Sequence, residues 1–138
     1  MLITLERTAC YGPCPIYKLS VKGDGSVEFD GEKFTETTGK AEGKISQEKI
    51  RELIKAFKEA DYFGFDDSYD EKNCPASATD SSTVITSIQI NGRKKTIKHY
   101  LGCADGTEEH RPYPAKLCEL EYKIDEMVGT KRWIREGK

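Results

Sequence analysis

The chain has 138 residues, of which 36% are hydrophobic and 33% charged, and its formal net charge is −2. This size and composition predict one domain over residues 1–138 with its own core, and the near-neutral charge is not typical of a nucleic-acid-binding protein. No run could span a membrane and no signal peptide is evident, so we expect a cytoplasmic protein with no membrane partner.

The N-terminal third is predicted to be an antiparallel meander of four strands. Apolar and polar side chains alternate over residues 2–8 and again over residues 16–22, which is the pattern of strands with one wet face. Gly23-Asp24-Gly25 predicts a tight turn into a third strand. A fourth, weaker strand is expected from Phe34 to Thr38.

The clearest helical pattern begins after Ser46, which is a good N-cap residue, and Glu48 stands in the first turn, where the helix dipole favours an anion. Apolar residues then recur at helical spacing: Ile50, Leu53, Ile54 and Phe57. This spacing predicts a helix with one buried face. Residues 66–82 follow as a long acidic loop.

Two further strands, Val84 to Ile90 and Lys94 to Leu101, flank Asn91-Gly92. Asn-Gly between alternating apolar residues is the strongest short-range sign of a β-hairpin. A two-residue turn places His99 on the same face as Val84, so we expect His99 to lie in the core.

After a second loop, apolar residues recur at helical spacing from Leu117 to Val128, and Gly129 suits the end of a helix. The complete order is β-β-β-β-α-β-β-α. It predicts an α+β fold, with an antiparallel sheet of about six strands and two helices packed on one face.

The cysteine content is unusual for a short chain. There are five, Cys10, Cys14, Cys74, Cys103 and Cys118. An odd number excludes a complete set of internal disulfides. In a reducing cytosol, paired cysteines more often indicate metal or redox chemistry, a preference that reverses if the protein is exported.

Cys10 and Cys14 fall between the first two predicted strands. Cross-strand neighbours have Cβ atoms roughly 4.5–5.5 Å apart, close to what a disulfide needs. So small a loop would stabilise the fold by only ~2 kcal/mol. Three interpretations of the pair therefore stay open: a structural disulfide or turn staple, a redox-active pair, or half of a metal site.

The metal hypothesis adds His99 and Cys103 to Cys10 and Cys14, because Cys₃His is an accepted zinc ligand set. Against it, His99 is predicted to face the core, where a hydrogen-bonded structural histidine is the favoured interpretation. No cofactor is expected on the main hypothesis, and zinc is the alternative.

Other candidate sites are weaker. The acidic loop fails as a calcium site, because Glu71 stands where a glycine is required and Ser77 where a bidentate glutamate belongs. Basic residues gather on the predicted hairpin (Arg93, Lys94, Lys95, Lys98) and in a tail (Lys131, Arg132, Arg135). Such charges suit a solvated edge as well as phosphate contacts, and a nucleic-acid partner is not expected.

Several segments together carry a resemblance. They are Cys10-Tyr11-Gly12-Pro13-Cys14-Pro15 with Tyr17, Gly23-Asp24-Gly25, Asp61-Tyr62-Phe63, Asp67 with Tyr69, Thr79-Asp80, Asn91-Gly92, and Gly129-Thr130 with Arg132-Trp133. With them the chain resembles, over nearly its whole length, a prokaryotic domain-of-unknown-function family marked by a Cys-x-Gly-x-Cys-Pro-x-Tyr segment. The resemblance implies no assigned activity. It also implies that Cys74, Cys103 and Cys118 are particular to this chain.

No familiar catalytic motif is present, and we lean against an enzyme. The first hypothesis is a small soluble non-catalytic binding or assembly domain, with a Cys10/Cys14 hairpin pair and a protein as its unidentified partner. The alternative is a thiol-redox or zinc-handling protein that uses Cys10, Cys14, His99 and Cys103.

Overall fold

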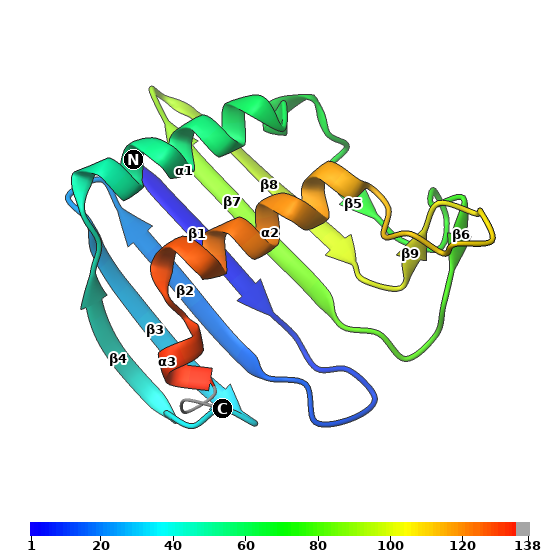
Figure 1. Ribbon diagram of the computed structural model, residues 1–138, viewed down its shortest axis with the longest axis horizontal. Helices are drawn as coiled ribbons and strands as arrows, with labels where there is room; N and C mark the ends of the chain where they lie inside the picture. Colours follow the sequence, from blue (N-terminus) through cyan, green and yellow to red (C-terminus); the bar gives the residue numbers. More distant parts are fainter. Residues whose placement is uncertain (135–138) are drawn as a thin grey trace.

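The computed structural model describes residues 1–134. It confirms the predicted α+β class: Figure 1 shows one large sheet with its helices crossing the face toward the viewer. Arg135 of the predicted basic tail lies outside the described residues.

The main sheet has seven strands in the order β4-β3-β2-β1-β7-β8-β5. Their bounds are β1 Leu2–Arg7, β2 Ile16–Lys22, β3 Ser26–Lys33, β4 Gly39–Lys44, β5 Ser68–Tyr69, β7 Thr83–Ile90 and β8 Arg93–Tyr100. All neighbours are antiparallel except β5, which pairs in parallel with β8. A second, two-stranded sheet joins β6 (Ala76–Ser77) to β9 (Cys103–Ala104). The predicted meander and hairpin are both present, and the short strands β5, β6 and β9 are additions from the two loops.

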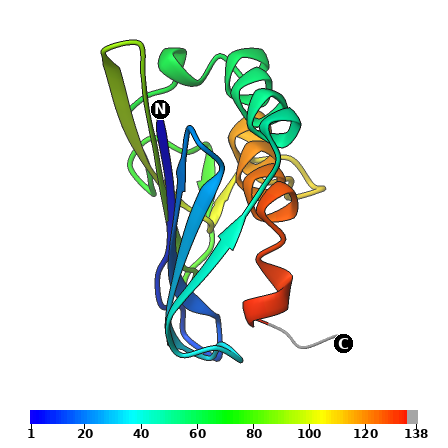
Figure 2. The same ribbon diagram turned by 90° about the vertical axis from the view of Figure 1, so that its left-hand side faces the viewer.

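The helices are α1 (Gln47–Glu59), the 3-10 turn η1 (Tyr62–Gly64), α2 (Ala115–Val128) and α3 (Lys131–Ile134). As predicted, Ser46 caps α1, its Oγ accepting the Lys49 amide hydrogen at 3.2 Å. Gly129 ends α2 with a left-handed φ of 75°. Figure 2 shows both long helices on the same side of the sheet. No helix within residues 1–134 has the length and apolar character needed to cross a bilayer.

The fourth strand was expected at 34–38 and lies instead at 39–44. Phe34 has a left-handed φ of 58°, so the predicted segment is the turn. The strand escaped prediction because small residues replace the usual apolar ones. A Cβ added at Gly43 would lie within 3.1 Å of the Trp133 ring, so the missing side chain leaves room for that indole.

The core lies between the sheet and the two long helices. Its largest fully buried apolar side chains include Tyr17, Phe29, Leu53, Tyr62, Ile97, Leu117 and Ile124. The opposite face of the sheet carries a row of alternating charges across four strands: Lys40 pairs with Asp30, Asp30 with Lys18, and Lys18 with Glu6. Opposite charges on neighbouring strands stabilise strand pairing, and a face that carries them can remain in contact with water.

Candidate functional site

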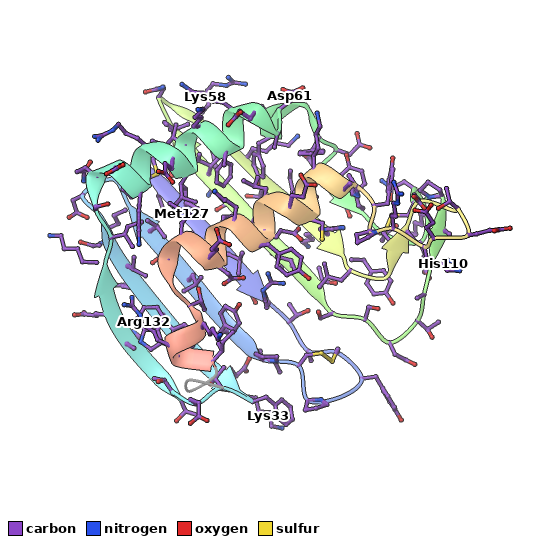
Figure 3. All side chains as sticks on the ribbon, viewed as in Figure 1. Lys33, Lys58, Asp61, His110, Met127 and Arg132 are labelled. Carbon is purple, nitrogen blue, oxygen red and sulfur yellow. A yellow bond between two sulfur atoms is a disulfide. The ribbon has the colours of Figure 1, made fainter. Side chains whose placement is uncertain are left out.

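The loop between β1 and β2, residues 8–15, is closed by a disulfide. Cys10 and Cys14 are bonded, with their Cα atoms 5.8 Å apart, and the bond is visible in Figure 3. β1 and β2 remain paired up to Arg7 opposite Tyr17. The disulfide therefore fastens the loop just beyond the last strand pair.

Hydrogen bonds to the first residue of β7 and to the segment before it hold the same loop in place. The Thr8 amide donates to the Thr83 carbonyl (3.1 Å), and the Thr83 amide donates to Thr8 Oγ1 (2.9 Å). Further out, the Tyr11 amide donates to the Asp80 carbonyl at 3.2 Å. The backbone at Tyr11 is thus anchored while its side chain remains 87% exposed.

A second exposed aromatic residue lies at this end of the sheet. Ile16 pairs with Lys33 across β2 and β3, so the turn that starts at Phe34 lies next to the Cys10–Cys14 loop. Figure 3 shows Lys33 at the same end of the sheet as the disulfide. The Phe34 side chain is 51% exposed. Aromatic residues are enriched in the buried centres of protein interfaces relative to the rest of the protein surface.

The four predicted zinc ligands are not brought together. Cys10 and Cys14 share one disulfide, and Cys103 forms another with Cys74, 29 residues away in sequence. His99 is committed to hydrogen bonds in the core. Within residues 1–134 no group of three or more potential ligands is suited to hold a metal ion. The remaining thiol, Cys118, is half-buried, and burial raises its pKa.

His99 lies in the core, as predicted, with a 1% exposed fraction. Its Nδ1 is 2.6 Å from Glu121 Oε2, and its Nε2 is 2.9 Å from the Tyr113 carbonyl oxygen. Because a carbonyl only accepts, Nε2 must carry a hydrogen. The contact between Nδ1 and Oε2 then needs one more proton, held by either partner. The buried pair therefore shares a single proton and carries no net charge.

Burial also raises the pKa of the Glu121 carboxyl, and the hydrogen bond from His99 only partly opposes this effect. Glu121 Oε1 has no hydrogen-bond partner within residues 1–134. A buried polar atom without a partner costs stability, and the cost is far larger when the group is ionised than when it is neutral. Both observations favour a protonated Glu121–His99 pair.

A second polar cluster joins α2 to the strands that carry the loop. Arg7 Nη2 donates to Asp125 Oδ2 at 2.7 Å, and the Tyr17 hydroxyl donates to Asp125 Oδ1 at 2.9 Å. Burial and the neighbouring Asp125 carboxylate raise the pKa of Tyr17. Burial opposes the positive charge of Arg7, but the attraction of Asp125 outweighs it and raises the Arg7 pKa. The cluster ties the last residue pair of β1 and β2 to α2.

Sequence reasoning missed Glu121, although the chain contained a signal for it. Glu121 stands four residues after Leu117 and three before Ile124, on the apolar face of α2. A carboxyl within such a stripe needs a buried partner, and His99 was already expected in the core. The Cys74–Cys103 pairing had no comparable signal, because it depends on how two loops meet.

These observations sort the polar features by accessibility. The His99–Glu121 and Arg7–Asp125–Tyr17 contacts are directed inward and hold α2 on the sheet. The Cys10–Cys14 loop is directed outward and presents an aromatic side chain. The loop is therefore the better candidate for contact with another molecule.

One family model, described as a domain of unknown function (DUF6438), matches residues 1–128. Comparison with curated proteins finds no match.

Proposed function

We propose that this chain, which belongs to the DUF6438 family of domains of unknown function, is a small non-catalytic binding domain. Its contact surface is the disulfide-closed loop, residues 8–15, together with the adjoining turn at Phe34. The observation that carries the proposal is Tyr11, whose side chain is exposed while its backbone is anchored.

Preorganisation supports this role. Ordering a flexible loop on binding costs free energy, and a disulfide removes part of that cost in advance. Tyrosine also suits the role, because it offers a large apolar ring with a polar end and few rotatable bonds. The partner we propose is a protein, since aromatic anchors of this kind are typical of protein interfaces.

Tyr11→Ser should weaken partner binding roughly 30-fold or more, because a tyrosine anchor at an interface contributes about 2 kcal/mol or more. The matched control is Tyr122→Ser, which removes an aromatic side chain that is 68% exposed on α2. The measurement is quantitative capture of cell proteins by each immobilised variant, followed by titration of the captured species. Equal losses for both variants, or a loss for Tyr122→Ser alone, would contradict the proposal.

The two disulfides support an oxidising compartment as the place of action, instead of the cytoplasm expected from the sequence. Alkylation of the denatured but unreduced protein should label one cysteine per chain, Cys118, and reduction should expose the other four. Mass spectrometry of protein purified from its natural source reads this directly. Labelling of all five cysteines before reduction would refute the oxidised state.

The alternative function is thiol redox chemistry at Cys10 and Cys14. The partly exposed position of this pair favours it, whereas Cys103 of the other pair is only 2% exposed. Equilibration in glutathione buffers separates the two functions. A structural disulfide stays oxidised across the range, while a catalytic one is reversibly reduced within it.

A further inference from the structure

A cavity of about 300 Å³ lies between the C-terminal half of α1, the turn η1 and the β7–β8 hairpin. Figure 2 shows the tip of the hairpin at the same end of the sheet as η1 and α1. β1 and β7 are antiparallel, so this end is opposite the Cys10–Cys14 loop. The cavity is therefore separate from the proposed contact surface.

The cavity wall is mostly apolar. Its apolar lining residues are Ile54, Phe57, Tyr62, Phe63, Ile88 and Ile90. The Tyr62 hydroxyl is hydrogen-bonded to Thr86 Oγ1 at 2.8 Å, and its ring packs edge-on against Phe57 at 4.8 Å. These contacts leave no unsatisfied polar atom on Tyr62 and fix its ring. The wall is thus preformed, as in typical ligand sites.

Charged side chains surround the mouth of the cavity. Arg93 comes from the hairpin, Lys58 from the last turn of α1, and Asp61 from the residues before η1. The Arg93 guanidinium lies over the Phe63 ring, 4.0 Å from its centroid, which holds it beside the opening. Within residues 1–134 neither Arg93 nor Lys58 has an ion-pair partner. The mouth carries a net positive charge.

We propose that this cavity binds a small amphiphilic carboxylate, with its apolar chain inside and its carboxylate at Arg93 and Lys58. An apolar wall selects an apolar body, and the volume is at the small end of known ligand sites. The unpaired Arg93 and Lys58 side chains favour a ligand with an anionic head group. The planar guanidinium of arginine can also donate two parallel hydrogen bonds to a carboxylate. Asp61 disfavours a more highly charged head, because it reduces the positive charge available.

The test uses hexanoate as the probe and the ¹⁵N-labelled full chain. Hexanoate should produce saturable amide shifts in the second half of α1, in η1 and at the β7–β8 turn. Hexanol, the neutral match, should bind more weakly. Arg93→Gln should weaken hexanoate binding about tenfold or more, since a hydrogen bond between charged groups contributes about 1.5–3 kcal/mol.

Lys94→Gln is the matched control, because it removes the same charge from the next residue, whose side chain lies on the opposite face of β8. It should leave the affinity unchanged, and circular dichroism should show both variants folded. Three results would each overturn the proposal: no saturable shifts, equal weakening by the two variants, or hexanol binding as tightly as hexanoate.

Discussion

His99→Ala should lower the free energy of unfolding by about 3–5 kcal/mol, because it leaves the Glu121 carboxyl buried without its partner. Glu121 is 1% exposed, and its other oxygen already has no hydrogen-bond partner within residues 1–134. Urea denaturation near neutral pH measures the effect. A loss below about 1 kcal/mol would show that the contact contributes little.

Glu121→Gln is the conservative control. Its amide can donate to His99 Nδ1 without an ionisable proton, so we expect a much smaller loss than for His99→Ala. The same variant tests the shared proton through pH. The folded-state pKa of Glu121 is raised by burial, so the folded chain binds this proton more tightly than the unfolded chain does.

The sign of the pH effect follows from that shift. The stabilisation from Glu121 is fully present below the ordinary glutamate pKa of about 4.3 and is lost as pH rises through the raised folded pKa. The stability of the wild-type chain relative to Glu121→Gln should therefore fall as pH rises through this window. If the free energy of unfolding had the same pH dependence in both proteins, the His99–Glu121 pair would not hold the proposed proton.

Removing the Cys74–Cys103 disulfide should destabilise the fold more than removing Cys10–Cys14. The bonded cysteines are 29 residues apart in sequence for Cys74–Cys103 and 4 residues apart for Cys10–Cys14. The chain-entropy relation then gives about 3.5 kcal/mol for the longer loop and about 2 kcal/mol for the shorter one. Paired alanine substitutions, Cys74→Ala with Cys103→Ala against Cys10→Ala with Cys14→Ala, followed by urea denaturation, measure the difference.

Alanine is preferred to serine in this comparison because Cys103 is buried, and a buried hydroxyl would add a cost of its own. Addition of a reductant to the wild-type protein should reproduce the sum of both losses. If the Cys10–Cys14 variant is the less stable of the two, the prediction is wrong. The short disulfide loop would then stabilise the fold by more than its closure entropy alone.

The regular elements were predictable where local chemistry and tertiary packing agree. Ser46 and the apolar spacing of α1 predicted that helix, and Asn91-Gly92 predicted the hairpin, in which both residues have left-handed φ angles. β4 was misplaced because its inner face is covered by Trp133, a residue about 90 positions away. No local pattern records that contact.

The candidate sites divide in the same way. The Cys10–Cys14 pair lies in a hairpin whose geometry is local, so spacing alone indicated its proximity. His99 was predicted to face the core, and Glu121 could have been matched to it from the apolar face of α2. The pairing of Cys103 with Cys74, and the cavity between α1 and the hairpin, are not encoded by any short-range spacing.

Local sequence patterns were enough to predict the α+β class, the two long helices, the hairpin and the inward face of His99. These follow from side-chain periodicity and from turn and cap residues, which act over a few positions. Which cysteine bonds Cys103, where β4 pairs, and which cations lie beside an apolar cavity became known only from the folded structure. Those outcomes depend on long-range packing, where the free energy gained by burying distant surfaces outweighs local preference.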